Sequence, residues 1–222
     1  MYFITHNVGF FWKTAGDRQS QSNMETNQNY CILYVVYNMN DIKYIHLVIP
    51  GLYISGTLPL ENSASLQEYD IQNILCCVPK KDIGNLHQDL LLENSHICVL
   101  YLPYRDTLKQ NLWQRADNLD FIKYTSDFSE LQKNTDTLSY YHKKPLIEVG
   151  YDFIDASISN KKNILVHCQM GKSRSASVII YYLMRKYNMT YNSAKTLLRS
   201  KRSLIEPNSY FEKQLSVINK KN

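Results

Sequence analysis

The segment from Ile164 to Tyr187 constrains the fold more than any other part of this sequence. Ile164-Leu165-Val166 predicts a short buried strand, and helical spacing begins near Ser173. The connection between them is a tight loop, in which Gly171 lets the backbone turn back on itself. A strand that passes through a short loop into a helix is typical of domains in which helices cover a sheet.

The rest of the chain repeats this alternation of short apolar runs with helical spacing. Strands are also expected at Tyr30–Tyr37, Tyr44–Ile49, Leu52–Ile54, Ile71–Val78 and Ile97–Leu102. Helices are expected at Ser63–Tyr69, Ile147–Ile158, Ser173–Tyr187, Tyr191–Lys201 and Pro207–Asn219, with Thr190 as an N-cap and Pro207 in a first turn. The fold class expected is therefore α/β, with a central, mainly parallel sheet flanked by helices.

Composition divides the chain into an extension and one domain. Residues 1–29 are rich in Gln, Ser, Asn and Thr and predict a polar amino-terminal linker. Residues 30–222 are expected to form one domain, in which about 112–145 resemble an insertion. A domain of ~150 residues buries about 70% of the surface that its unfolded chain exposes, which suffices for an enclosed site.

The sequence also indicates where the protein works. Its apolar runs fall far short of the ~20 residues that span a bilayer, and no basic leader is visible. Its 5 cysteines lack a CxxC pair, which speaks against a disulfide framework and a zinc site. We expect an intracellular, cytoplasmic protein. The bias toward Tyr and Asn is typical of AT-rich coding DNA, and a viral protein of this kind would act in the host cell cytoplasm or the virion.

Charge is unevenly placed along the chain. The formal net charge is +5, but residues 161–222 hold 13 Lys and Arg against 2 Glu, a balance of +11 that leaves −6 for the first 160 residues. This polarity favours an anionic ligand near the carboxy-terminal third, whether phosphate, nucleic acid or an acidic membrane surface. A solvated basic helical face is the alternative.

The loop after the predicted strand carries the residues best suited to chemistry. Loop amides and the amino end of the following helix form a nest for a tetrahedral anion. The same field lowers the pKa of a cysteine from ~8.5, so Cys168 is a candidate nucleophile. Arg174, six residues on, can hold two phosphate oxygens with its planar fork. The alternative for Cys168 is a buried core thiol.

At these residues the chain resembles the cysteine-dependent protein phosphatases, and the run from His167 to Ser175 resembles their dual-specificity branch. Ile49–Gly56 and Ile71–Val78 are similar to the first strands of that family. Tyr181–Met184 is similar to the helix after the loop, and Lys201–Asn208 to the closing segment. The resemblance covers roughly residues 45–218 apart from the insertion, and it implies an α/β phosphatase that needs no metal or cofactor.

The resemblance also implies roles for individual residues. Cys168 attacks phosphorus to give a phosphocysteine that water hydrolyses, and Ser175 assists departure of the thiolate. His167 hydrogen-bonds to the loop backbone and helps to set the pKa of the cysteine, or is an ordinary core histidine. Asn208 supports the loop, or is an ordinary helix cap. The phosphate-binding loop comprises Gln169, Met170, Gly171, Lys172, Ser173 and Arg174.

Two aspartates compete for the role of general acid, which protonates the leaving oxygen. Asp106 follows the predicted strand and Pro103-Tyr104-Arg105, a context that resembles the family, but it lies 62 positions before Cys168. Asp136 lies 32 positions before it, which is the spacing usual in the family, but no strand precedes it. We prefer Asp106, because local context survives an insertion while spacing does not.

Several alternatives remain open at the level of the substrate. Phosphotyrosine and phosphoserine or phosphothreonine in proteins are the expected substrates. RNA 5′ ends and phosphoinositides are alternatives, which the basic carboxy-terminal third and Lys172 permit. A phosphate-binding pseudophosphatase is a third hypothesis. Cys76 and Cys77 are expected to be core thiols, the alternative being a disulfide that protects Cys168.

Overall fold

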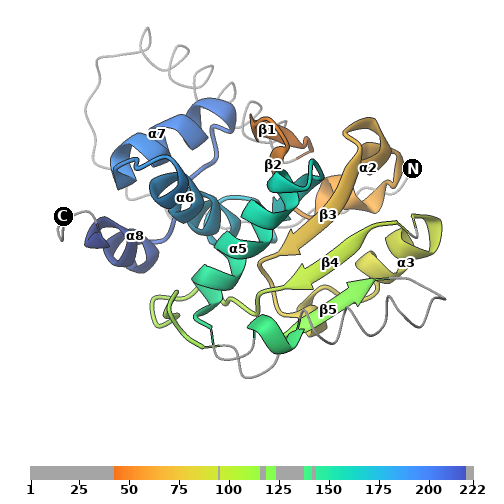
Figure 1. The fold of residues 1–222 in the computed structure, drawn as a ribbon, viewed down its shortest axis with the longest axis horizontal. Coiled ribbons are helices and arrows are strands. Elements are labelled where there is room, and N and C mark those ends of the chain that lie inside the picture. Colours follow the sequence, from red (N-terminus) through yellow and green to blue (C-terminus); the bar gives the residue numbers. More distant parts are fainter. Residues whose placement is uncertain (1–42, 95, 116–118, 124–137, 142–143, 219–222) are drawn as a thin grey trace, which may run out of the picture. The chain divides into compact units, whose positions relative to one another are not determined.

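The computed structural model describes residues 43–94, 96–115, 119–123, 138–141 and 144–218 (Figure 1). Within these residues the strands form one sheet in the order β1-β2-β6-β3-β4-β5. The strands are β1 (His46–Ile49), β2 (Leu52–Ser55), β3 (Ile71–Cys76), β4 (Cys98–Tyr101), β5 (Asp120–Lys123) and β6 (Asn163–His167). The predicted strand at Tyr30–Tyr37 and the extension at 1–29 lie outside the described residues.

The centre of the sheet is parallel and its two edges are antiparallel. β6 runs parallel to both β2 and β3, and β3 runs parallel to β4. β1 pairs antiparallel with β2, and β5 pairs antiparallel with β4. The expected α/β fold with a mainly parallel sheet is confirmed.

The central strands are buried on both faces. Successive strand residues point to opposite faces of a sheet, yet every residue of β4 and all but the first of β6 are buried. Uninterrupted apolar runs such as Ile164-Leu165-Val166 therefore form strands that are covered on both sides, as parallel sheets require.

The helices form two groups. They are the short 3-10 helices η1 (Leu58–Glu61) and η2 (Lys80–Asp82), with α2 (Ala64–Glu68), α3 (Leu86–Glu93), α5 (Leu146–Ser159), α6 (Arg174–Lys186), α7 (Tyr191–Lys201) and α8 (Ser209–Ser216). In Figure 1, α5 to α8 gather on one side of β3 to β5, while α2 and α3 lie on the other. Gly150 lets α5 pack closely, since a Cβ there would lie 2.7 Å from Val178 Cγ1.

The sequence located most of these elements to within a few residues. Thr190 caps α7 by accepting a hydrogen bond from the Ser193 amide, as expected. The expectation that Pro207 lies in the first turn of the last helix is wrong, because Asn208 is the N-cap and α8 begins at Ser209. Two elements, α3 and β5, have no counterpart among the elements expected from the sequence, and β5 lies within the expected insertion.

The register of the sheet places four residues in one row at the carboxyl ends of the parallel strands. Ser55 pairs with His167, His167 with Cys76, and Cys76 with Tyr101. Ligands of open α/β sheets bind beyond this edge of the sheet. Cys168 directly follows His167, so the fold delivers it to that edge.

Candidate active site

The loop from Cys168 to Ser173 joins β6 to α6. Arg174 is the first residue of α6, and Ser173 is its N-cap. Gly171 has a φ of +64°, and a Cβ there would lie 2.3 Å from the carbonyl oxygen of Ser55. Glycine is therefore required here for two reasons. It adopts a left-handed backbone conformation without strain, and it lets the loop approach the end of β2 closely.

Four consecutive loop carbonyls are held by groups outside the loop. The hydrogen bonds are Thr57 N to Gln169 O (3.1 Å), Arg202 Nη2 to Met170 O (2.9 Å), Arg202 Nε to Gly171 O (3.1 Å) and Glu206 N to Lys172 O (2.9 Å). Peptide groups whose oxygens are held outward turn their N–H groups the other way, into the loop. Converging amides of this kind form an anion-binding nest.

Cys168 lies at the base of this nest and is buried. Its Sγ accepts a hydrogen bond of 3.3 Å from Ser175 Oγ. Burial raises the pKa of Cys168. The Arg174 charge and hydrogen bonds from Ser175 and from the Lys172 backbone lower it by more than burial raises it, so the net pKa is below the usual value. The loop therefore favours a thiolate at this position.

Arg174 lies beside the carboxylate of Asp106. Arg174 Nε is 3.6 Å from Asp106 Oδ2, and the arginine side chain is mostly buried. The buried Nε has no hydrogen-bond partner among the residues that the structure describes. The guanidinium thus retains an N–H group that can donate to a phosphate oxygen.

Two hydrogen bonds hold Asp106 against the loop. Its Oδ1 accepts from Ser173 Oγ at 2.7 Å and from Asn208 Nδ2 at 2.8 Å. Asp106 is therefore placed against Ser173 at the end of the loop that begins at Cys168, despite its long separation in sequence. Asp136, the competing aspartate, lies outside the described residues.

Asn208 combines the two functions that the sequence offered as alternatives. Its Oδ1 caps α8 by accepting from the amides of Tyr210 and Phe211. Its Nδ2 donates to Asp106, and its backbone N–H donates to Ser173 Oγ at 3.1 Å. The residue that begins α8 therefore also fixes the Asp106 loop and the phosphate-binding loop relative to each other.

His167 also contacts a side chain that the sequence did not predict. Its Nε2 lies 3.0 Å from Nε2 of His87 on α3, and His87 Nδ1 lies 2.7 Å from Tyr101 Oη. The Nδ1 of His167 is buried and makes no hydrogen bond of normal geometry to any described residue. Burial and the neighbouring His87 lower the pKa of His167, whereas the Cys168 backbone acts to raise it.

Sequence reasoning missed two residues that shape this site, His87 and Arg202. Arg202 is completely buried although it belongs to the strongly basic carboxy-terminal third. Its only signal was its place in the closing segment that resembles the phosphatase family. His87 gave no signal, because the helix that carries it was not expected.

Cys76, His87 and His167 form a buried group whose donor atoms lie within 4.8 Å of one another. Such a donor set has the chemistry of a zinc site. However, these side chains are at most 1% exposed and already hydrogen-bonded, Cys76 Sγ to Val78 O at 3.5 Å and the histidines to each other. The donor atoms that would face an ion therefore already contact one another or the backbone.

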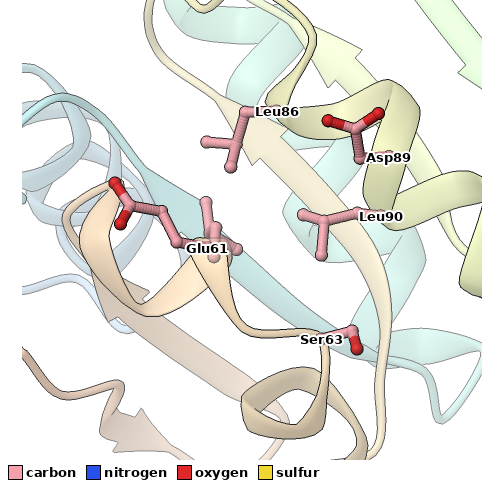
Figure 2. A pocket seen from close by; sticks show the side chains of 6 residues that line it. Glu61, Ser63, Leu86, Asp89 and Leu90 are labelled. Atoms are coloured by element: carbon pink, nitrogen blue, oxygen red, sulfur yellow. The ribbon is translucent and has the colours of Figure 1, made fainter.

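A separate pocket of about 260 Å³ lies between η1 and α3. Figure 2 shows Leu86, Asp89 and Leu90 of α3 facing Glu61 and Ser63 across it. None of its lining residues belongs to the loop from Cys168 to Ser173. The pocket is therefore distinct from the anion-binding nest.

No helix in the described ranges is long and apolar enough to span a bilayer.

Comparison with known proteins agrees with the geometry. The family model "Dual specificity phosphatase, catalytic domain" matches residues 59–221. A protein of Acanthamoeba polyphaga mimivirus, "Putative tyrosine-protein phosphatase R622", is 36% identical over 177 residues, which cover 79% of this chain and 84% of that protein. "Dual specificity protein phosphatase 1B" of Arabidopsis thaliana is 43% identical over 70 residues, 32% of this chain and 42% of that protein.

Solved structures share the fold. The human tyrosine phosphatase-like serine/threonine/tyrosine-interacting protein superposes with a TM-score of 0.59 at 22% identity, covering 80% of this chain and 97% of that one. DUSP15 superposes with a TM-score of 0.54 at 19% identity, covering 79% and 87%. With the sequence match over most of its length, the chain belongs to the dual specificity phosphatase family of the protein tyrosine phosphatase superfamily.

Proposed function

We propose that this phosphatase hydrolyses phosphate monoesters of proteins through a phosphocysteine intermediate on Cys168. The observation that carries the proposal is the loop whose carbonyls are held outward from Gln169 to Lys172. Its inward amides and Arg174 supply donors to the equatorial oxygens of a transferring phosphoryl group. Electrostatic stabilisation by such fixed donors is a large term in catalysis.

The reaction proceeds in two displacements. In the first, Cys168 Sγ attacks phosphorus, the bond from phosphorus to the ester oxygen breaks, and Asp106 gives that oxygen a proton. In the second, water attacks the phosphocysteine and gives its proton to Asp106. The bond from sulfur to phosphorus then breaks, and the Ser175 hydroxyl stabilises the departing thiolate.

Phosphotyrosine and phosphoserine or phosphothreonine are the proposed target groups. The family match and the mimivirus relative named as a tyrosine-protein phosphatase support a protein substrate. The excess of 11 positive charges in residues 161–222 favours RNA 5′ ends or phosphoinositides as the alternative. Lys172 at the loop weighs little here, because its Nζ is paired with Glu206 Oε2 at 3.0 Å.

The four described cysteines are free thiols. A thiolate nucleophile requires reducing conditions, so we propose that the protein acts in the cytoplasm, or in the host cell cytoplasm or virion if it is viral.

Turnover of two substrates in EDTA tests the mechanism. Para-nitrophenyl phosphate needs little protonation of its leaving group, whereas a phosphotyrosine peptide needs more. We expect Cys168→Ser to abolish turnover of both. We expect Asp106→Asn to reduce peptide turnover by roughly 10²-fold or more, while it affects the nitrophenyl ester far less.

The outcomes separate the alternatives. Selective loss of peptide turnover in Asp136→Asn instead of Asp106→Asn would transfer the role of acid to Asp136. Strong preference for an RNA 5′-triphosphate or a phosphoinositide over both phosphopeptides would replace the protein substrate. Tight phosphopeptide binding without hydrolysis would identify a pseudophosphatase.

A further inference from the structure

Three buried side chains next to the phosphate-binding loop, Tyr101, His87 and His167, take no direct part in the two proposed displacements. Tyr101 Oη is 2.7 Å from His87 Nδ1, and His87 Nε2 is 3.0 Å from His167 Nε2. His167 directly precedes Cys168. A continuous chain of hydrogen bonds therefore runs from β4 through α3 to the residue beside the nucleophile.

Both imidazoles in this chain are neutral near pH 7. Burial lowers the pKa of His87 to about 4, and burial together with His87 lowers the pKa of His167. A neutral imidazole carries one N–H, so one Nε2 donates and the other accepts. The direction of the chain depends on which nitrogen of His167 carries its hydrogen.

The backbone beside His167 favours one of the two directions. It acts to raise the pKa of His167 as a hydrogen-bond acceptor would, although its contact with the buried Nδ1 falls short of normal hydrogen-bond geometry. Nε2 of His167 faces His87, so the hydrogen belongs on Nδ1. It follows that His87 Nε2–H donates to His167 and that Tyr101 O–H donates to His87.

We propose that His87 and Tyr101 are positioning residues that hold His167 in the Nδ1–H tautomer, with that hydrogen facing the Cys168 backbone. This rests on the proposed function of Cys168 as the nucleophile. The opposite tautomer would turn a lone pair toward the Cys168 backbone, which acts on His167 as a hydrogen-bond acceptor. The series of hydrogen bonds from Tyr101 through His87 to His167 therefore favours the thiolate form of Cys168 through the backbone. Arg174 and Ser175 favour the same form within the loop.

The surroundings leave few other groups that could set this tautomer. Among the described residues, the titratable groups acting on the two histidines and the loop thiol are Tyr101 of β4, Cys76 of β3, Cys77 beyond it, and Arg174 of α6. On α3, Leu86, Asp89 and Leu90 line the pocket of Figure 2, while His87 is buried against His167. One residue of α3 thus reaches His167, the neighbour of the nucleophile, while other residues of this helix line a pocket.

The test measures the thiolate without requiring turnover. Alkylation of Cys168 by iodoacetamide is followed across pH by mass spectrometry of the peptide that contains it, in EDTA. His87→Leu removes the donor, and we expect the apparent pKa to rise by about one unit, or about tenfold less thiolate below it. Tyr101→Phe should give a smaller rise. His87→Gln should restore most of the wild-type value, because its amide nitrogen can donate in place of Nε2.

Ser157→Ala is the matched control for loss of buried hydrogen bonds. Ser157 Oγ accepts from Asn73 Nδ2 at 2.9 Å and donates to Phe153 O at 2.6 Å, in contact with the amino-terminal half of β3. This variant should lower the melting temperature and leave the alkylation pKa unchanged. A similar result for His87→Leu, with a lower melting temperature but no pKa shift, would overturn the proposal.

A metal site would overturn it as well. In Cys168→Ser protein, addition of Co²⁺ should give no thiolate charge-transfer absorption. A band that appears there and disappears when His87→Leu is added would identify Cys76, His87 and His167 as metal ligands. Because alkylation needs no phosphate ester, failure of the phosphatase activity and failure of this proposal are separate results.

Discussion

Arg174 is the residue whose charge most favours a thiolate at Cys168. Burial raises the pKa of Cys168, and the Arg174 charge is the largest of the effects that lower it. A lowered pKa means that the thiolate persists to lower pH than in a free cysteine. The reactive form is then lost only as pH falls through that lowered value.

Arg174→Met should therefore move the acid limb of the pH profile to higher pH. We expect the apparent pKa of Cys168 in the alkylation profile to rise by about one unit or more. Arg185→Met is a suitable control, because Arg185 pairs with Glu148 away from the loop. An unchanged profile in Arg174→Met would show that the loop amides and Ser175 are sufficient.

The chemistry of single residues was predictable where it lay within one short stretch of sequence. Cys168, Arg174 and Ser175 lie within one loop and the start of the helix that follows it, so their spacing in the sequence is enough to bring them together. Asp106 was chosen for the strand before it, and the structure places it against Ser173 and Arg174. His87 and Arg202 act only through tertiary contacts, and a buried arginine cannot be told from an exposed one by its neighbours in sequence.

At the scale of elements, the end of β2 and the loop after β6 approach each other closely at Gly171. A Cβ on Gly171 would lie 2.3 Å, 2.4 Å and 2.8 Å from backbone atoms of Ser55 and Gly56. Backbone cannot move away as a flexible side chain can. The loop therefore keeps its shape only while this position lacks a side chain.

Gly171→Ala should reduce activity far more than a substitution with the same backbone strain elsewhere. Gly84 is the matched control, because its φ is +65° and no heavy atom of the described residues lies within 4 Å of where its Cβ would be. Gly84→Ala should cost about 1–2 kcal/mol of the free energy of unfolding and leave kcat unaltered. Gly171→Ala should destabilise the protein further and lower kcat/KM by about 10²-fold. Equal effects of the two substitutions in melting and turnover assays would contradict this prediction.

The elements that sequence analysis missed are those that depend on partners distant in the chain. β5 has four residues and exists by pairing with the edge of β4. α3 is short and its N-cap Asn85 makes no side-chain capping bond, so little in the local sequence marks its start. By contrast, β6 and α7 carry their own signals, an apolar run in one and a capping threonine in the other.

At the scale of the whole molecule, the described domain carries much of the uneven charge. Several of the carboxy-terminal cations are partly neutralised, such as Lys186 by Asp155 and Lys195 by Glu212. The excess of positive charge in residues 161–222 nevertheless remains large. Such a field attracts anionic substrates at distances up to a Debye length, about 10 Å at 0.1 M salt.

Salt should therefore weaken the encounter with substrate without altering the chemical steps. Between about 0.05 M and about 0.5 M salt we expect kcat/KM for an acidic phosphotyrosine peptide to fall several-fold while kcat stays constant. A phosphotyrosine peptide with neutral flanks is the control and should lose less. Equal loss for both peptides would mean that the charge does not steer the substrate.

The hydrogen bonds that hold the loop carbonyls outward come from residues far from the loop in the sequence. Thr57 precedes the loop by more than a hundred residues, and Arg202 and Glu206 follow it by about thirty. The shape of the segment from His167 to Ser175 therefore depends on residues on both sides of it in the sequence. Transplanted alone into another protein, this segment would keep Cys168 and Arg174 but lose the hydrogen bonds that hold its carbonyls outward. A chain that ends after Lys201 would retain every strand of the sheet and still lose contacts that shape the loop.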